Sequence, residues 1–164
     1  MKNINLKIGM LNCHGLPKTE DLKCSKHFIW FLQSQSLDIL VLQETYADDK
    51  DLQTHDQTQF QSASSFWSQH VGIVSLNPSI TLSLISSELD GQVMHINASH
   101  SSFSFSPINL IIIYAPAHYS QWDSFYTSLL YLPFFCSSFF EHSLLLGDFN
   151  HQILSPSLNG VPDI

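Results

Sequence analysis

Oxygen-bearing side chains directly follow three apolar stretches of the sequence. They are the amide of Asn12, the carboxylate of Glu44, and the carboxylate and amide of Asp148 and Asn150. Carboxylate and amide oxygens without a Cys or His pair at ligand spacing suit a hard cation such as Mg²⁺. Each of these residues is also common as a cap or a turn residue, so a metal site requires that the fold brings them together.

The stretches that precede these side chains have the patterns of strands. Residues 4–10 alternate between apolar and polar, whereas residues 37–42 and 143–146 are almost continuously apolar, as in strands covered on both faces. Between the first two, the apolar spacing predicts a helix from Thr19, as its cap, to about Gln35. Strand, helix, strand is typical of α/β proteins, in which the C-terminal ends of strands form the site crevice. We therefore expect Asn12, Glu44 and Asp148 to converge.

The middle of the chain predicts a meander of strands. We expect a long polar loop over residues 45–62 and strands near residues 60–67, 71–76, 80–86 and 92–99, with a hairpin turn at Asp90-Gly91 between the last two.

The most apolar strand candidate covers residues 107–114 and ends at Tyr114. After it, Ser120-x-x-Asp123 resembles a capping box and predicts a helix that Pro133 ends. A membrane span over residues 125–146 is disfavoured, because proline, serine, glutamate and histidine interrupt the apolar run.

Five short motifs occur in a fixed order: Asn12-x-x-Gly15-Leu16, Leu42-Gln43-Glu44-Thr45, Gly72-Ile73-Val74, Tyr114-Ala115-Pro116 and Gly147-Asp148-Phe149-Asn150. Together they resemble the endonuclease/exonuclease/phosphatase superfamily, and most closely the endonuclease domains of non-LTR (LINE-type) retrotransposons and their apurinic-endonuclease relatives. The resemblance covers residues 4–151. It implies a metal-dependent phosphodiesterase whose ancestral reaction is DNA nicking, and a reverse transcriptase downstream in an intact element.

The resemblance also implies a role for each matched residue. Glu44 corresponds to the ligand of Mg²⁺, or of Mn²⁺ in its place, and Asn12 to its neighbour near the metal and the scissile phosphate. Tyr114 corresponds to a phosphate contact, Asp148 to the group that orients or deprotonates the attacking water, and Asn150 to the amide that holds this water and the developing charge. Phosphodiester hydrolysis needs such a Lewis acid, base and set of donors.

The chain departs from the family pattern after its last motif, because it has no terminal Ser-Asp-His to supply a catalytic histidine. We expect His14, His70, His118 and His151 to be surface or loop residues that do not replace it. Residues 1–164 are then expected to form a partial domain, a truncated four-layer α/β sandwich with one mixed sheet, its helices and the first strand of the second sheet. The expected consequences are weak or absent activity and self-association through an exposed sheet face.

The charge composition of the chain restricts the class of binding partner. The chain has six lysines, all within the first 50 residues, no arginine, and a net charge of −8. Binding to nucleic acid through many phosphate contacts is therefore disfavoured, although the resemblance implies DNA or another phosphodiester as the substrate. Three alternatives stay open: a superfamily phosphatase that acts on a small phosphorylated substrate, a non-catalytic binding remnant, and an unrelated acidic α/β protein. Three cysteines and no signal-like start predict an intracellular protein, nuclear or cytoplasmic, with no membrane partner.

Overall fold

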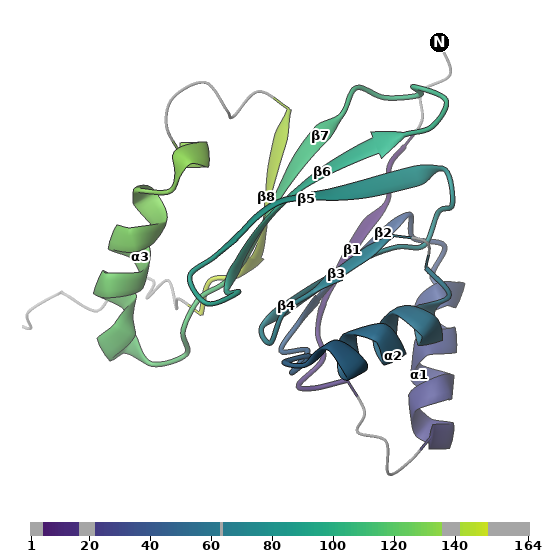
Figure 1. Ribbon diagram of the computed structural model, residues 1–164, viewed down its shortest axis with the longest axis horizontal. Coiled ribbons are helices and arrows are strands. Elements are labelled where there is room, and N and C mark those ends of the chain that lie inside the picture. The colour runs from purple at the N-terminus through teal and green to yellow at the C-terminus, as the bar shows by residue number, and fades with distance from the viewer. Residues whose placement is uncertain (1–4, 17–21, 63, 136–141, 151–164) are drawn as a thin grey trace, which may run out of the picture.

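The chain folds into four layers, with two sheets between outer helices (Figure 1). The computed structural model describes residues 5–16, 22–62, 64–135 and 142–150. The first sheet has the strand order β1-β2-β4-β3 and the second β5-β6-β7-β8. The strands are β1 (Ile8–Asn12), β2 (Ile39–Gln43), β3 (Ser65–Trp67), β4 (Val71–Ser75), β5 (Ile80–Glu88), β6 (Val93–His100), β7 (Ile108–Tyr114) and β8 (Ser143–Asp148).

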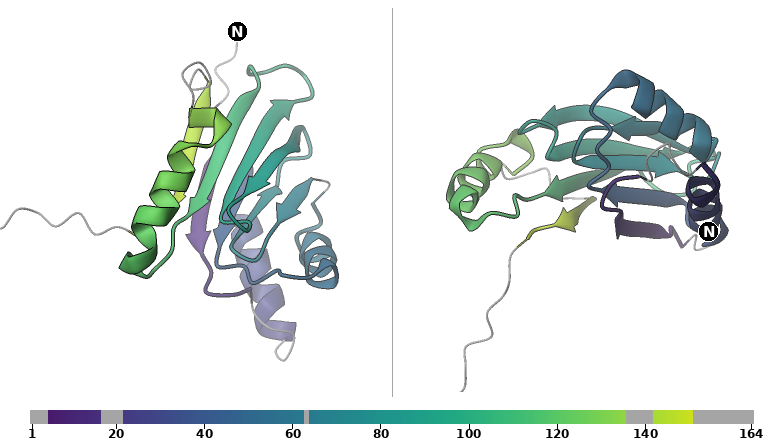
Figure 2. Two further views of the ribbon diagram at one scale, coloured as in Figure 1. Left: turned by 60° about the vertical axis from the view of Figure 1, so that its left-hand side comes forward. Right: turned by 90° about the horizontal axis from the view of Figure 1, so that it is seen from below.

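The helices cover the two outer faces. Helices α1 (Leu22–Ser34) and α2 (Lys50–Phe60) lie on the first sheet, and α3 (Trp122–Leu130) lies on the second, as Figure 2 shows from below. Short 3-10 turns precede and follow α3, at Tyr119–Gln121 and Pro133–Phe135. No helix in the described part of the chain is long and apolar enough to cross a membrane.

Each sheet contains one parallel strand pair joined by a helix. The pair β1 and β2 is joined through α1, and the pair β7 and β8 through α3, whereas the other neighbouring strands are antiparallel. In these pairs Asn12 lies opposite Gln43, and Tyr114 lies opposite Asp148. The two β-α-β units therefore end their strands with the side chains that the sequence singles out.

Alternating side chains divide the core into three apolar layers. Ile39, Val41 and Ile73 point to the second sheet, where they pack with residues such as Ile96 and Ile112. Their neighbours Leu40, Leu42 and Val74 point to the helices and pack against Ile29, Leu32 and Phe60. On the outer side, Ile111 and Ile113 pack against Phe125 and Leu129 of α3. Burial of each such side chain contributes roughly 1.5–3 kcal/mol relative to exposure.

The predicted four-layer α/β sandwich is confirmed, and its second sheet is larger than expected. It holds four strands rather than the first strand alone. The reason lies in residues 76–79, which carry the chain from β4 in one sheet to β5 in the other. Alternation in a sequence predicts strands, but it does not indicate which sheet a strand joins.

The loop expected over residues 45–62 is wrong, because helix α2 occupies most of it. The Asp49 side chain accepts a hydrogen bond from the Leu52 backbone N–H at 2.8 Å and caps the helix. Phe60 and the polar Asp56 are its buried residues. With so few apolar residues the segment shows no helical period, so the pattern could not reveal the helix. The strand expected near residues 60–67 is correspondingly short, since β3 covers Ser65–Trp67.

Two expected helix starts differ in outcome. The Ser120 capping box is wrong: α3 is preceded by Gln121, which makes no side-chain cap hydrogen bond. Instead the Trp122 indole N–H donates to the Pro116 carbonyl oxygen at 2.8 Å and fixes the start of the helix against the preceding turn. The expected cap at Thr19 lies outside the described residues.

Candidate active site

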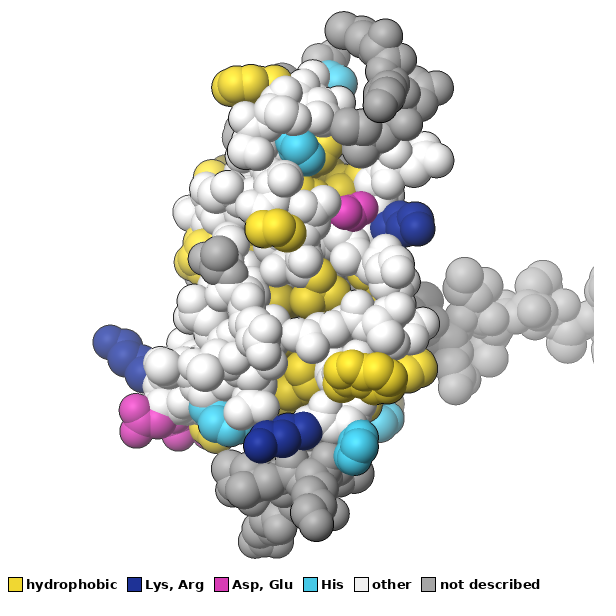
Figure 3. Space-filling view, turned by 90° about the vertical axis from the view of Figure 1, so that its right-hand side faces the viewer, with side chains coloured by type: hydrophobic (Ala, Val, Ile, Leu, Met, Phe, Trp, Pro, Cys, Tyr) yellow, Lys and Arg dark blue, Asp and Glu magenta, His cyan; other side chains and the backbone are white. Residues whose placement is uncertain are grey.

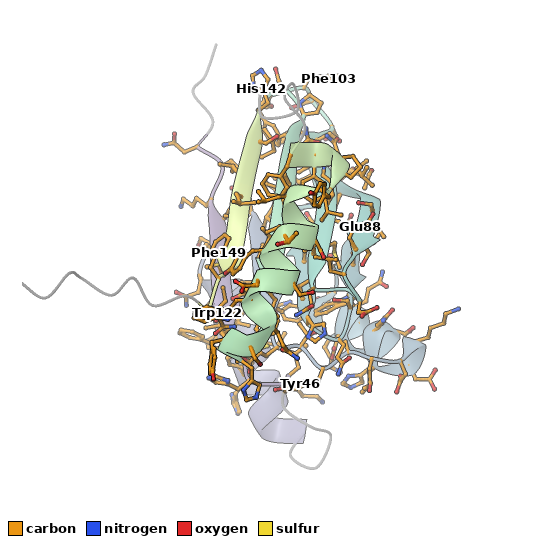
Figure 4. All side chains as sticks on the ribbon, turned by 90° about the vertical axis from the view of Figure 1, so that its left-hand side faces the viewer. Tyr46, Glu88, Phe103, Trp122, His142 and Phe149 are labelled. Carbon is orange, nitrogen blue, oxygen red and sulfur yellow. The ribbon has the colours of Figure 1, made fainter. Side chains whose placement is uncertain are left out.

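The C-terminal ends of the two parallel strand pairs border one crevice, at the lower end of the sheets in Figure 1. The crevice has a volume of about 1010 Å³. It is lined by Met10, Asn12, Gln43, Ala117, His118, Tyr119, Trp122, Gly147, Asp148, Phe149 and Asn150. Figure 4 shows Trp122 and Phe149 on the same side of the molecule, and Tyr46 near the same end of the sheets.

Glu44 is the centre of a hydrogen-bond cluster beside this crevice. Its Oε1 atom accepts from the Asn12 amide at 2.8 Å and from the Tyr114 hydroxyl at 3.0 Å. Its Oε2 atom lies 2.8 Å from Nδ1 of His14 and 3.5 Å from the Tyr46 hydroxyl. The cluster joins the two sheets, because Asn12 and Glu44 follow strands of the first sheet and Tyr114 ends a strand of the second.

Backbone contacts hold the loops that carry this cluster. The N–H groups of Cys13 and Gly15 donate to the carbonyl oxygens of Gln43 and Glu44 at 3.0 and 2.6 Å, so the loop after β1 is fastened to the loop after β2. His14 and Glu44 have φ angles of +47° and +53°, in the left-handed region that such residues seldom adopt. Backbone strain of this kind costs about 1–3 kcal/mol a residue and is typical of functional sites.

Beneath the cluster, Gln43 connects the sheets. Its side chain is buried, and its amide donates to the Ile113 carbonyl oxygen at 3.1 Å. A buried amide needs such partners, because an unpaired polar group costs free energy in the apolar interior. This bond therefore fixes the separation of β2 and β7 directly below Glu44 and Tyr114.

The hydrogen bonds lower the pKa of Glu44 below its ordinary value. The Asn12 amide contributes most, while partial burial opposes the shift and the bonds from His14 and Tyr114 lower the pKa further. The carboxyl group is therefore ionised at neutral pH. For Tyr114, burial, the bond to Glu44 and the nearby charges, including Asp148, raise the pKa to about 12, so the phenol stays a donor.

Asp148 and Asn150 form a second group on the other side of the crevice. The Asn150 backbone N–H donates to Oδ1 of Asp148 at 2.9 Å, and its side-chain amide donates to the Ala115 carbonyl oxygen at 2.6 Å. Ala115 in turn donates its N–H to the Asp148 carbonyl oxygen at 2.8 Å. These bonds hold the turn after β8 against the turn after β7, with the Asp148 carboxylate close enough to act on Tyr114.

Charge in this region is negative. Among the described residues that line the crevice, Asp148 carries the carboxylate and none is a lysine. On the face in Figure 3, the lysine side chains that are drawn lie apart from one another, and some lie beside acidic side chains. A phosphate group in the crevice would therefore have to be held by hydrogen-bond donors and by a bound cation.

The donor chemistry at Glu44 fits a divalent cation. An ionised carboxylate beside an amide suits an ion that keeps several waters and takes one or two protein carboxylates. Within the described residues no group of three or more His, Cys, Asp or Glu could hold a metal ion. Such an ion would therefore be bound by few protein atoms and by water and substrate oxygens.

The structure brings the predicted site residues into two adjoining groups. Asn12, Glu44 and Tyr114 are directly hydrogen-bonded, and Asp148 and Asn150 border the same crevice as Asn12. The predicted roles of these residues remain predictions.

Three histidines expected to be surface or loop residues lie at the site. His14 is exposed, but it contacts Glu44. His70 stacks on Tyr114 with ring centroids 5.6 Å apart, and His118 lines the crevice. His14 had a signal in the sequence, because it lies within the same Asn12-x-x-Gly15-Leu16 motif. His151 lies outside the described residues.

Neither protein-family models nor curated protein sequences contain a match to this chain. Solved structures do. A humanised D. rerio TDP2 (tyrosyl-DNA phosphodiesterase 2) with 14 mutations superposes with a TM-score of 0.62 at 13% identity, over 90% of this chain and 67% of that chain. D. rerio TDP2 complexed with single-strand DNA product gives a TM-score of 0.59 at 13% identity, over 90% and 61%. A truncated Caenorhabditis elegans TDP2 gives 0.53 at 15% identity, over 90% and 63%.

These similarities show the fold. The chain shares the α/β sandwich fold of these TDP2 structures. It spans about two thirds of the length of the first of these chains and less of the other two.

Proposed function

We propose that the chain is a metal-dependent phosphodiesterase domain that acts on DNA. The observation that carries the proposal is the ionised Glu44 carboxylate, held by donors from both sheets beside a crevice that also presents Asp148 and Asn150. The fold shared with TDP2, which has been solved with a DNA product, supports a DNA substrate.

In this proposal Glu44 and Asn12 would hold Mg²⁺ or Mn²⁺, and the bound ion would supply a Lewis acid for the phosphate oxygens. The Tyr114 hydroxyl, with its pKa of about 12, donates a hydrogen bond and keeps its proton. Asp148 orients an attacking water and accepts its proton, and its own carboxylate is positioned by the Asn150 N–H. Asn150 offers an amide to the developing charge.

The residues that line the crevice also support the expectation that the reaction of this chain is slow. The described residues that line the crevice include no lysine, and the sequence has no arginine, so these residues offer no permanently charged cation to the transition state. Low activity of the 164 residues, an incomplete domain without the Ser-Asp-His motif, self-association and an intracellular location all remain predictions. Leu144 and Leu145 on edge strand β8 are 43% and 45% exposed, as self-association would require.

The finer assignment to LINE-type endonucleases predicts nicking of duplex DNA. The second candidate function is a phosphatase for a small phosphorylated substrate. The lack of lysine among the described residues of the crevice lining favours it, because such a substrate needs fewer phosphate contacts. Supercoiled plasmid, a labelled single strand and a nucleoside monophosphate distinguish these substrates under identical conditions.

The test is a single-turnover cleavage assay with enzyme in excess over each substrate, with and without Mg²⁺ or Mn²⁺. We expect slow, metal-dependent cleavage of DNA that Glu44→Gln and Asp148→Asn each reduce at least about 100-fold. Glu88→Gln is the matched control, since Glu88 lies on β5 and does not line the crevice. Cleavage that is independent of metal, or equal in wild type and Glu44→Gln, would contradict the proposal.

A further inference from the structure

His14 lies directly against the carboxylate that we propose as a metal ligand. Nδ1 of its ring is 2.8 Å from Oε2 of Glu44. The His14 side chain is 81% exposed and that of Glu44 17%, so solvent reaches the pair mainly at the imidazole. The other carboxylate oxygen is bound by Asn12 and Tyr114, whereas Oε2 contacts His14 and accepts a longer bond of 3.5 Å from the Tyr46 hydroxyl.

The fold determines the place of the imidazole. The His14 backbone N–H donates to Oδ1 of Asn12 at 3.1 Å, in a turn that holds φ of His14 at +47°. The next residue, Gly15, has φ of +88° and is fastened to the Glu44 carbonyl oxygen. The chain therefore leaves β1 in a turn that directs the ring to Glu44, although the side chain is largely exposed.

The spacing of the two atoms suits two ligands of one ion. Ligands at right angles around a metal, each about 2.1 Å from it, are about 3 Å apart. The measured 2.8 Å lies close to this separation. The contact is a hydrogen bond with Nδ1 directed at Oε2, so the ring would have to turn Nδ1 toward the ion, and the exposed side chain leaves space for this rotation.

The two donors also indicate the class of metal. Divalent first-row transition metals bind mixed nitrogen and oxygen sites, Mn²⁺ with the lowest affinity of the series, whereas Mg²⁺ prefers oxygen ligands and keeps its waters. To bind Oε2, Mg²⁺ would have to displace the His14 ring and gain no nitrogen ligand in exchange.

We propose that His14 and Glu44 together bind a divalent first-row transition-metal ion such as Mn²⁺, and that His14 makes the crevice selective for it over Mg²⁺. This proposal rests on the proposed function only for the role of Glu44 as a ligand. His14 is then a metal ligand, a role that an exposed loop histidine would not have.

The test measures binding directly. We expect His14→Ala to weaken the Kd for Mn²⁺ at least about tenfold, and the Kd for Mg²⁺ to change less than about twofold, as measured by calorimetry. Electron spin-echo modulation of bound Mn²⁺ should show coupling to an imidazole ¹⁴N in wild type, and His14→Ala should remove it. His14→Asn retains a polar atom near the Nδ1 position and tolerates a positive φ, so it tests the same ligand if the alanine variant does not fold.

The controls separate this proposal from the proposed function. His27→Asn, on the exposed side of α1, should leave both affinities unchanged. Mn²⁺ that binds equally to wild type and to both His14 variants, but not to Glu44→Gln, would overturn the role of His14 and leave the Glu44 site standing. Binding that Glu44→Gln does not weaken, or no binding to wild type, would overturn both.

Discussion

Gly147 controls how closely β8 approaches β7, one residue before Asp148. A Cβ atom at this position would lie 1.9 Å from the Ile113 carbonyl oxygen and 2.8 Å from its carbonyl carbon. Ile113 is the residue opposite Gly147 in the parallel pair. Because the colliding atoms belong to the backbone, no side-chain rotation relieves the contact, and Gly147→Ala must move the strand.

The size of the effect follows from the overlap. Cβ contacts in proteins essentially never fall below 3.0 Å, so the oxygen and the new carbon must separate by about 1 Å. Such a shift weakens the last ladder hydrogen bonds of β8, each worth about 0.5–1.5 kcal/mol, and disturbs the Gln43 bond to the same oxygen. We expect Gly147→Ala to lower the free energy of unfolding by about 3 kcal/mol.

Gly9 provides the matched control, because it lies in β1, the edge strand of the other parallel pair. A Cβ there would lie 2.3 Å from Cδ1 of Leu37, the end of a flexible side chain that can rotate away. We expect Gly9→Ala to cost about 1 kcal/mol. Urea denaturation followed by circular dichroism measures both. The reasoning is refuted if the two variants unfold at the same urea concentration.

Four further predictions concern the site. Gln43→Leu should lower the free energy of unfolding, measured by urea denaturation, by about 2 kcal/mol, because the Ile113 carbonyl oxygen loses a buried donor. An unchanged free energy of unfolding would show that this bond does not join the sheets. Because the folded-state pKa of Glu44 lies below its ordinary 4.5, the group stabilises the fold above about pH 4.5, and this contribution is lost as the pH falls through the folded pKa. Urea unfolding should therefore show a stability gap between wild type and Glu44→Gln that narrows from pH 6 to pH 3, and a constant gap would contradict the lowered pKa. Tyr114→Phe should raise the pKa of Glu44, measured by carbon NMR of the carboxyl group, since one lowering hydrogen bond is removed; an unchanged titration would count against that bond. Burial raises the pKa of the Cys13 thiol to about 11. In a variant whose other two cysteines are replaced by serine, Cys13 of the folded protein should react with a disulfide reagent at pH 8 at least about 100-fold more slowly than in urea. Equal rates would exclude a buried thiol.

The sequence predicts the strand ends well because each has a local signal. Continuous apolar runs before Glu44 and Asp148 indicate strands, and β2 and β8 are found there. β2 is buried throughout as expected, whereas β8 is a partly exposed edge strand. The parallel pairing of these strands with their partners follows from the helices between them. Hence the order of elements predicted that Asn12, Glu44 and Asp148 converge: Asn12 and Asp148 line one crevice, and Asn12 donates to Glu44. The bond from Tyr114 to Glu44 was not predicted in this way.

Other features depend on contacts between distant segments. Helix α2 is polar except for Leu52 and Phe60, so its stability comes from its Asp49 cap and from burial of Phe60 against the first sheet, which no local pattern shows. The stacking of His70 on Tyr114 likewise joins the turn before β4 to the end of β7 in the other sheet. For His14, the residue type alone was ambiguous, and the backbone turn that directs it to Glu44 decides its place.

The central claim is that Glu44 supports metal-dependent cleavage of a phosphodiester bond. Its most direct test is the single-turnover rate of DNA cleavage by wild type, Glu44→Gln and Glu88→Gln, with and without Mn²⁺. Our account predicts slow cleavage that requires the metal, persists in Glu88→Gln and is lost in Glu44→Gln. Cleavage that continues at the wild-type rate in a folded Glu44→Gln variant would contradict it.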